Sequence, residues 1–225
     1  MTTLPDVTLV CLDCEDVVRA IKIMEYCKTQ CEFGDVVFLT SEETDYPHTS
    51  IDKIGTTGNR VTGLTEYSKF FLHHLHEHVH TSHMLVVQHD GWILDGDKWN
   101  PRWMNLDYVG PLFVQYAAVG SGGFSLRSTR LMKLVSDICP PFENGTFGKT
   151  GFVWEDGMIC FGLRRQLMAA GMRYAEIRAA GKFAYGGNKS CYCAEPFGFH
   201  GFYALDTLLG GTGENIPRTP QLEMI

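Results

Sequence analysis

The sequence lacks any apolar run of about 18 residues, the length that a membrane-spanning helix requires. Its first segment, MTTLPDVTLVCLD, also differs from a secretory signal peptide, because Asp6 and Asp13 enclose only a short apolar stretch. Both absences predict a protein with no membrane span and no export, and we expect it to be cytoplasmic.

Positive charge is scarce. The chain has 19 Lys and Arg residues against 26 Asp and Glu residues, a net charge of -7 at pH 7, and no long basic run. Because bulk binding to nucleic acid depends on positive charge, this composition argues against generic nucleic-acid binding. A basic patch confined to a single binding site is still compatible with this composition.

The eight cysteines do not indicate a disulfide framework, because such frameworks occur in short secreted chains and this sequence has no export signal. We therefore expect mostly reduced thiols. Cys11, Cys14, Cys27 and Cys31 have a spacing that zinc could use. Because Cys11 falls inside a predicted strand, structural zinc is the weaker alternative.

The apolar periodicity alternates between strand and helix. Strands are predicted at 7–12, 35–40, 84–87 and 114–119, and helices at 17–24, 67–75, 131–138 and 154–170. Residues 41–63 are polar and rich in Thr and Gly, which predicts an irregular segment. This order predicts one Rossmann-like α/β domain with a central, mainly parallel mixed sheet flanked by helices, followed by a loose glycine-rich tail.

Ligands of open α/β sheets bind beyond the carboxyl ends of the strands. In this sequence that rule selects Asp13, Thr40 and the segment Gln88-His89-Asp90. Asp90 suits a divalent ion such as Mn2+ or Mg2+, which prefers oxygen ligands and tolerates nitrogen. An ordinary turn at Asp90-Gly91 explains the same residues equally well.

Three further segments carry residues suited to chemistry. The glycine-rich segment GSGGFSLR, residues 120–127, would let a ligand approach the backbone, although a tight strand connection also explains it. Glu155 and Asp156 stand at a predicted helix start, which favours an ionised proton acceptor or reflects only the charge bias of helix ends. His200 is a structural histidine when taken alone, and a second metal ligand when paired with Asp90.

Six of the nine histidines lie in the segment HHLHEHVHTSH, residues 73–83. Pairs four residues apart, such as His74 and His78, would share a helix face and could bind zinc. A solvated helix surface is the favoured interpretation.

Five blocks, taken in order, form a more specific pattern. QHDGW, DYVG, GSGGFSLRS, WEDGMIC and FGFHG resemble a family of GT-A-type glycosyltransferases with an uncharacterised domain, DUF5672. The resemblance extends over nearly all of the expected folded part. It implies a GT-A-like domain at residues 1–203 and a C-terminal tail at residues 204–225.

The resemblance also implies roles. Asp90 and His200 would hold Mn2+ or Mg2+ on the donor pyrophosphate, with Gln88 standing where the family motif has a first aspartate. Asp156 would be the catalytic base that deprotonates the acceptor hydroxyl, with Glu155 as the alternative base. A single base on the far face implies inversion at the anomeric carbon.

Further side chains are expected to contact the substrates. The expected donor-binding residues are Asp13, Thr40, Gln88, His89, Gly122, Gly123, Arg127 and Lys182. Arg127 and Lys182 would lie near the phosphates, where positive charge stabilises the leaving group. The expected acceptor-binding residues are Trp92, Asp107 and Trp154.

The resemblance therefore implies a hexosyl- or pentosyltransferase that moves a sugar from a nucleotide sugar, most simply a UDP-sugar, to an acceptor hydroxyl. The acceptor would be a glycan, a lipid-linked sugar or a hydroxymethylated base in viral DNA. Two alternatives stay open. One is a metal-dependent hydrolase or phosphodiesterase that uses Asp90, His200 and the histidine-rich segment, and the other is a catalytically silent nucleotide-sugar-binding module, which Gln88 favours. The sequence does not indicate an oligomeric state.

Overall fold

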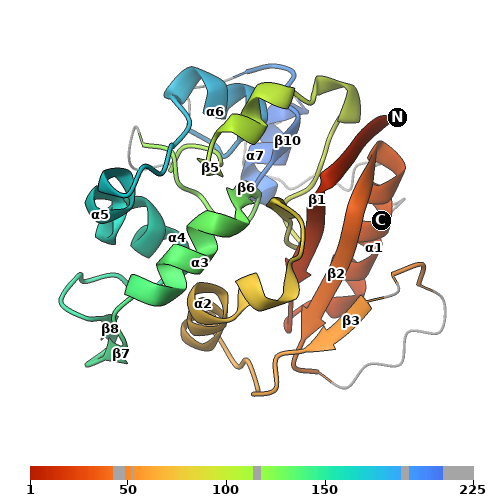
Figure 1. Ribbon diagram of the computed structural model, residues 1–225. Helices are drawn as coiled ribbons and strands as arrows, with labels where there is room; N and C mark the ends of the chain where they lie inside the picture. The colour runs from red at the N-terminus through yellow and green to blue at the C-terminus, as the bar shows by residue number, and fades with distance from the viewer. Residues whose placement is uncertain (43–48, 52, 114–117, 189–192, 210–225) are drawn as a thin grey trace.

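The computed structural model describes residues 1–42, 49–51, 53–113, 118–188 and 193–209. Six strands of this part of the chain form one sheet in the order β3-β2-β1-β4-β6-β5 (Figure 1). They are β1 (Thr2–Leu12), β2 (Cys31–Thr40), β3 (Lys53–Thr56), β4 (His83–Val86), β5 (Tyr108–Val109) and β6 (Ser125–Ser128). The first four are parallel, and β6 is antiparallel to both β4 and β5. The predicted mainly parallel mixed sheet is confirmed.

Helices flank the sheet, as predicted. They are α1 (Val17–Gln30), α2 (Leu64–His73), α3 (Thr129–Ile138), α4 (Glu155–Gly157), α5 (Arg164–Ala169), α6 (Ile177–Phe183) and α7 (Phe202–Leu208). Figure 1 shows α1 behind β1 and β2, and α2 and α3 side by side to the left of these strands. None of the helices in the described segments has the length and apolarity needed to cross a membrane.

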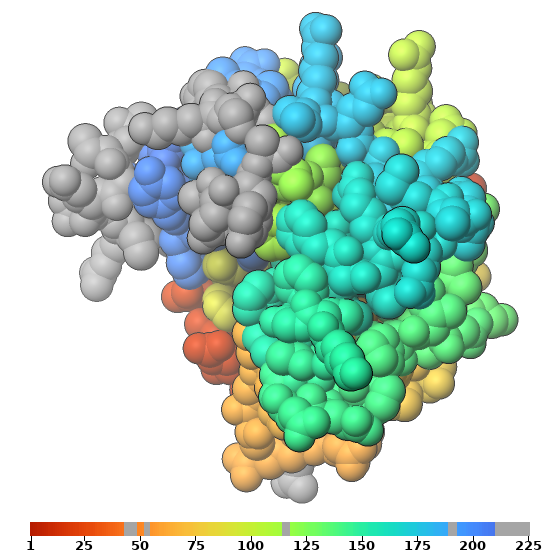
Figure 2. All heavy atoms as spheres, turned by 90° about the vertical axis from the view of Figure 1, so that its left-hand side faces the viewer, coloured from red at the N-terminus to blue at the C-terminus, as the bar shows by residue number. Residues whose placement is uncertain are grey.

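Shorter elements complete the described chain. Three are 3-10 helices: η1 (Leu75–His78), η2 (Gly96–Lys98) and η3 (Pro101–Asn105). Two strand pairs lie outside the main sheet: β7 (Phe142–Glu143) with β8 (Thr146–Phe147), and β9 (Ala184–Tyr185) with β10 (Gly198–Phe199). In Figure 2, the segment from β7 to α5, coloured green to teal, forms the centre of the face turned to the viewer.

The central strand reads as a continuous apolar run because it is buried on both faces. Every residue from Val7 to Leu12 is buried, and β1 pairs with β2 on one side and β4 on the other. Helix α1 buries Ala20, Met24 and Cys27, which recur at the spacing of one helix face. The strand predicted at 7–12 and the helix predicted at 17–24 are thus confirmed.

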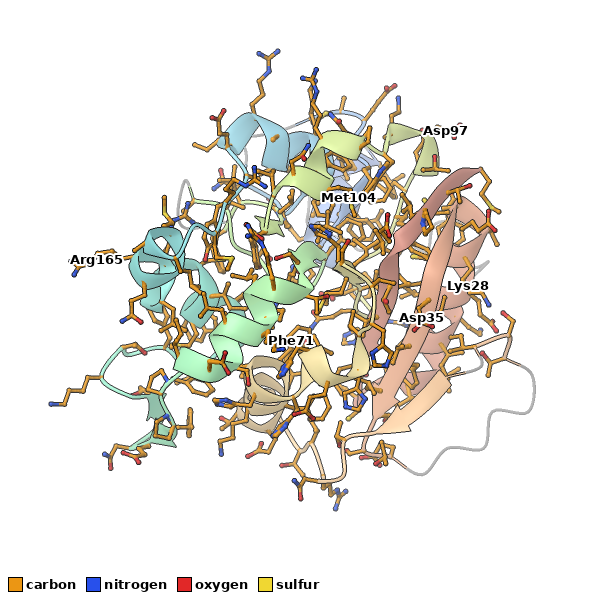
Figure 3. All side chains as sticks on the ribbon, viewed as in Figure 1. Lys28, Asp35, Phe71, Asp97, Met104 and Arg165 are labelled. Carbon is orange, nitrogen blue, oxygen red and sulfur yellow. The ribbon has the colours of Figure 1, made fainter. Side chains whose placement is uncertain are left out.

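The interior continues between the sheet and the helices on its other side. Phe71 of α2 is 1% exposed, and Figure 3 shows it pointing inward below α3. Arg165 of α5 points outward in the same view. Phe71 therefore belongs to the core between the sheet and these helices.

Two segments differ from their predicted secondary structure. The segment expected to be irregular contains β3, whose backbone pairs in parallel with β2 from Val37 to Thr40. Backbone hydrogen bonds to β2 hold this short strand at the sheet edge. Such pairing does not require an alternating side-chain pattern, so the local sequence did not reveal the strand. The predicted helix 154–170 is divided into α4, a π-helical turn η4 (Met158–Gly162) and α5, because the Leu163 N–H bonds to Met158 O.

Two boundaries also shift. The end of the glycine-rich segment is strand β6, which pairs with β4 and β5. Helix α7 crosses residue 203, where the tail was expected to follow, and its Ala204 and Leu205 are buried. The rest of the expected tail, from residue 210 onward, lies outside the described residues, as do residues 114–117 of the strand predicted at 114–119.

Candidate active site

The carboxyl ends of β1, β2 and β4 open onto one cleft. Because β1 lies between β2 and β4, the strand order reverses at this point, where open α/β sheets bind their ligands. The cleft has a volume of about 650 Å³, within the range of small-molecule sites. Its lining includes Asp13, Arg60, Tyr67, Gln88, His89 and Asp90.

Asp13 and His89 form a hydrogen-bonded pair in this cleft. Asp13 Oδ2 lies 2.7 Å from His89 Nδ1, and Asp13 Oδ1 accepts the N–H groups of Glu15 and Asp16 at 2.8 Å. Burial raises the pKa of Asp13, but the bonds from His89 and the two N–H groups outweigh burial and lower the pKa. The bond to Asp13 raises the pKa of His89 against the effect of burial. The pair thus favours a protonated imidazole at the cleft.

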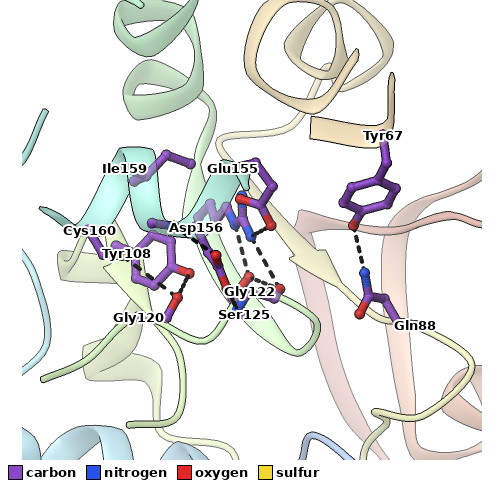
Figure 4. A network of polar contacts seen from close by, with 12 residues as sticks. Tyr67, Gln88, Tyr108, Gly120, Gly122, Ser125, Glu155, Asp156, Ile159 and Cys160 are labelled. Atoms are coloured by element: carbon purple, nitrogen blue, oxygen red, sulfur yellow. Dashed lines mark hydrogen bonds and ion pairs between the residues drawn. The ribbon is translucent and has the colours of Figure 1, made fainter. Parts of the chain in front are cut away.

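Gln88 is oriented by Tyr67 of α2. Gln88 Nε2 donates to Tyr67 Oη at 2.8 Å, as Figure 4 shows. Burial raises the pKa of the Tyr67 hydroxyl, which keeps it protonated. With its nitrogen held by Tyr67, Gln88 presents Oε1 toward Gly123, where an added Cβ would collide with it.

Asp90 and His200 are brought together from distant parts of the chain. Asp90 Oδ1 lies 3.5 Å from His200 Nε2, and each side chain is about one-quarter exposed. His200 Nδ1 lies 2.7 Å from Ser121 Oγ, which orients the ring. Burial raises the pKa of Asp90, but hydrogen bonding and attraction from His200, with attraction from His89, lower it overall. A carboxylate oxygen and an imidazole nitrogen at this distance fit a divalent ion such as Mn2+ or Mg2+.

Gly122 and Gly123 join two parts of the site. A Cβ on Gly123 would collide with both His200 Nε2 and Gln88 Oε1, so these atoms converge on the same point. A Cβ on Gly122 would lie 2.9 Å from the Cβ of Asp156. The two glycines therefore let the backbone pass between the Asp90 side of the site and α4.

Asp156 is anchored at the start of α4. Its Oδ2 accepts the Gly122 N–H at 2.9 Å, and its Oδ1 accepts the Gly157 N–H at 2.7 Å. Burial and the adjacent carboxylate of Glu155 raise the pKa of Asp156 to about 7, although Arg127 and the two N–H groups oppose the shift. A carboxylate that titrates near neutral pH is suited to general acid–base catalysis.

Arg127 and Glu155 are paired with each other in the interior. Arg127 of β6 is fully buried, and its Nη1 and Nη2 donate to the two carboxylate oxygens of Glu155 at 2.8 and 3.0 Å. Glu155 is 4% exposed. The predictions that Arg127 binds the donor phosphates and that Glu155 serves as a base do not fit this geometry, because neither side chain can reach a substrate.

Two expected acceptor contacts are also core residues. Trp92 is 1% exposed and packs edge-to-face against Phe199 at a ring distance of 4.4 Å. Asp107 is 2% exposed and accepts hydrogen bonds from Arg130 Nε and Nη2 at 2.7 Å. Because both side chains are engaged inside the protein, the prediction that they contact the acceptor does not fit either.

Of the other expected contacts, Thr40 is 3% exposed and its hydroxyl lies 3.8 Å from Cys14 Sγ, so it supports the loop and offers little surface to a ligand. Lys182 is exposed on α6 and does not line the cleft. Trp154, by contrast, is 39% exposed and lies two residues before Asp156. It remains available to an acceptor.

The histidine-rich segment is not one helix, because it spans the end of α2, η1 and the start of β4. His78 stacks on Phe70 with ring centroids 5.6 Å apart, and His83 Nε2 lies 3.1 Å from Leu106 O. Within the described residues, no three His, Cys, Asp or Glu side chains are grouped to hold a metal ion. The zinc alternatives, and a hydrolase with several such ligands, therefore find no support in that part of the chain.

Sequence reasoning missed three residues of the site. Arg60 is an exposed cation that lines the cleft just before α2, and nothing in its local sequence distinguishes it from other loop arginines. Tyr67 and Ser121 act by orienting Gln88 and His200. No local pattern could identify these two, because each contact joins segments that are far apart in the chain.

A family model, DUF5672, described as a protein of unknown function, matches residues 53–200. Curated proteins give no significant match. One similar solved structure is the mannosyltransferase PcManGT from Pyrobaculum calidifontis in complex with GDP-Man and Mn2+, at 12% identity and a TM-score of 0.45. The match covers 76% of this chain and 55% of that one, so the chain spans about half the length of that structure.

The family match extends over well over half of the chain. It includes the cleft residues from Arg60 to Asp90, the Gly122-Gly123 loop, Asp156 and His200. The chain belongs to the DUF5672 family.

Proposed function

We propose that the chain is a glycosyltransferase that moves a sugar from a nucleotide-sugar donor to an acceptor hydroxyl. The observation that carries the proposal is the meeting of separate sequence blocks at Gly122 and Gly123. Asp90 and His200 lie 3.5 Å apart on the Gly123 side, and Asp156 accepts the Gly122 N–H at 2.9 Å. A pair of divalent-ion ligands near a carboxylate base is the arrangement that this transfer needs.

The donor nucleotide would occupy the cleft at the carboxyl edge of the sheet, whose volume of about 650 Å³ suits a molecule of that size. Asp90 and His200, with Gln88 Oε1 near them, would hold Mn2+ or Mg2+, which supplies positive charge for the departing diphosphate. A protein that offers one carboxylate leaves coordination positions for donor phosphates and water. UDP-sugars are our proposed donor class.

Arg60 would contact the donor phosphates in place of Arg127 and Lys182. It is the one Lys or Arg among the described residues that line the cleft. A guanidinium binds phosphate through paired N–H donors, which gives orientation as well as charge. The hydrogen bond to Asp13 raises the pKa of His89, so the His89 imidazole adds positive charge in the same cleft.

Asp156 would accept the proton of the acceptor hydroxyl as that oxygen attacks the anomeric carbon. Its pKa of about 7 leaves a large share ionised at neutral pH, and its bonds to Gly122 and Gly157 fix the carboxylate. Direct attack with a single base implies inversion at the anomeric carbon. The exposed indole of Trp154 offers a flat face on which an acceptor sugar or base can stack. Glycans, lipid-linked sugars and hydroxymethylated DNA bases are the proposed acceptors.

A thermal-shift screen tests the donor site. The protein would be mixed with UDP-, GDP-, CMP- and dTDP-sugars, each with Mn2+, Mg2+ or EDTA. A ligand at about 100 times its dissociation constant adds about 2.7 kcal/mol to the free energy of unfolding, which such a screen detects. We expect one nucleotide sugar to raise the melting temperature with Mn2+ or Mg2+ and to lose most of that effect in EDTA.

Asp90→Ala should abolish the metal-dependent part of this shift, because it removes the one carboxylate of the metal-ligand pair. Asp97→Ala, at an exposed position of η2, is the matched control and should behave as the wild type. No response to any donor, or an equal response in Asp90→Ala, would contradict the proposal.

A further inference from the structure

Arg127 is an unusual residue for a protein interior. It is 0% exposed, yet all three of its guanidinium nitrogens have partners in the network shown in Figure 4. Nε donates to Ser125 Oγ at 2.9 Å, Nη1 and Nη2 donate to Glu155, and Nη2 also donates to Gly122 O at 3.2 Å. Because the guanidinium is fully buried and held by these partners, it cannot reach a substrate.

Aromatic rings enclose the same guanidinium. Its central carbon lies 4.8 Å from the ring centroid of Phe71 and 5.2 Å from that of Tyr108. Buried ion pairs of this kind contribute little net stability compared with apolar side chains of similar volume. Core stability alone therefore does not account for a charged pair at this place, and the geometry that the pair enforces is the better explanation.

The pair acts on both sides of Asp156. On one side, Arg127 Nη2 and Ser125 Oγ both donate to Gly122 O, at 3.2 and 2.8 Å. The N–H of the same Gly122 donates to Asp156 Oδ2 at 2.9 Å. On the other side, Glu155 is the residue directly before Asp156 in the chain, so its bond to Arg127 fixes the start of α4.

We infer that Arg127 and Glu155 are positioning residues, which tie the Gly122 loop of the sheet to α4 and thereby hold the Asp156 carboxylate in place. The inference rests on the proposed function only for the role of Asp156 as the base. It differs from a substrate contact, because the pair works through Asp156 from inside the protein.

The charges of the pair make the inference testable. The carboxylate of Glu155 raises the pKa of Asp156, and the guanidinium of Arg127 lowers it. Tyr108 of β5 and Cys160 of η4 also interact electrostatically with the Asp156 carboxylate. Burial raises the pKa of both groups, so they stay neutral around pH 7. Removing one member of the pair should therefore move the titration of Asp156 in a direction that depends on which member is lost.

The experiment is a carboxyl-carbon NMR titration of the full-length protein, with the Asp156 signal assigned by Asp156→Asn. Glu155→Gln should lower the pKa of Asp156 by about one unit or more, and Arg127→Gln should raise it by a similar amount. Arg130→Gln is the control, since Arg130 belongs to a second bidentate arginine–carboxylate pair, with Asp107, and should leave the titration of Asp156 unchanged. An Asp156 pKa equal to the wild type in both pair variants would overturn the inference.

Single variants leave an unpaired charge in the interior and can fail to fold. The double variant Arg127→Met/Glu155→Leu removes both charges and serves as the second test. We expect amide hydrogen exchange at Gly122 to become faster by about tenfold or more, because Gly122 O loses its guanidinium partner. Unchanged protection of that amide would overturn the positioning role.

The two proposals fail separately. Opposite shifts of the Asp156 titration in a protein that transfers no sugar would support the positioning role and reject the proposed activity. Sugar transfer that depends on Asp156, with an unmoved titration, would support the activity and reject the positioning role.

Discussion

Glu155 and Asp156 are adjacent in the chain, but their surroundings give them different chemistry. Glu155 is held by the two terminal nitrogens of Arg127 and has no exposed carboxylate to offer. Asp156 has two backbone N–H partners and a pKa raised to about 7 by burial and by Glu155. These different surroundings support the proposed division of roles, in which Glu155 is a positioning residue and Asp156 is the base.

Asp156→Asn should leave donor affinity near the wild-type level and slow sugar transfer about 100-fold or more, because it removes a general base without removing a donor contact. In the wild type, kcat/KM should fall as the pH drops below about 7, since the base must be ionised to accept a proton. Steady-state kinetics across pH 5–9 and calorimetry with the donor check both points. A fully active Asn variant would assign the base to another group.

Arg60→Gln should weaken binding of the nucleoside diphosphate about tenfold while leaving binding of the matching nucleoside unchanged, because the guanidinium is proposed to contact phosphate alone. Calorimetry with both ligands measures the difference. Arg102→Gln, at an exposed position of η3, provides the control for a general loss of positive charge. Equal loss for nucleoside and nucleoside diphosphate would place Arg60 elsewhere in the site.

At the scale of elements, the site depends on a loop that carries almost no side chains. Residues 120–123 connect into β6 and pass between Gln88, His200 and α4, where a Cβ would collide with atoms of each. Gly120 O accepts the Tyr108 hydroxyl at 2.6 Å and Gly122 O accepts the Ser125 hydroxyl at 2.8 Å. The loop is therefore held by its backbone oxygens, which leaves its small residues free to border the reacting groups.

Gly123→Ala should reduce the affinity for Mn2+, because the added methyl group would collide with His200 Nε2 and Gln88 Oε1 and push them apart. Mn2+ binding followed by electron paramagnetic resonance measures the loss without requiring activity. Gly63→Ala is the matched control, since its Cβ would come no nearer than 4.0 Å to the closest side-chain atom, a Glu66 carboxylate oxygen. Equal Mn2+ affinity in the two variants would separate Gly123 from the metal-ligand pair.

At the scale of the whole molecule, stability should change with pH in a predictable direction. The pKa of Asp156 is raised to about 7 from an unfolded value of about 3.9, so the native state binds the proton more tightly. The contribution of protonated Asp156 to the free energy of unfolding is therefore lost as the pH rises from about 4 to about 7. His89, with its raised pKa, acts in the same direction near neutrality. Asp13 and Asp90, with lowered pKa values, lose their contribution as the pH falls below about 4.

In urea unfolding with EDTA, the contribution of Asp156 should make the free energy of unfolding larger at pH 5 than at pH 8 by roughly 1–3 kcal/mol. His73, His78 and His83, whose pKa values are lowered mainly by burial, contribute in the opposite direction, so the wild type is compared with a variant that lacks the Asp156 carboxylate. Asp156→Asn should flatten this dependence, because Asn cannot ionise. Parallel pH profiles for the wild type and the variant would show that Asp156 titrates at its ordinary pKa.

The sequence predicted those parts of the fold that repeat locally. The run from Val7 to Leu12 and the helical spacing of Ala20 and Met24 identified β1 and α1, because burial imposes its period directly on neighbouring residues. It did not predict β3, which owes its conformation to pairing with β2. The π-helical turn after α4 likewise comes from one shifted backbone bond, from Leu163 N–H to Met158 O.

The same division holds for the site. The sequence by itself indicated Asp90, the adjacent Glu155 and Asp156, and His200 as candidates, because a carboxylate after a buried strand, acidic residues at a helix start and a glycine-flanked histidine leave local marks. The resemblance to the glycosyltransferase family, and not these marks, gave them their expected roles. Only the tertiary structure separated Asp156 from Glu155 and moved Arg127 into the interior. Burial, pairing and the resulting pKa values arise from atoms that are far apart in the chain, so no local pattern encodes them.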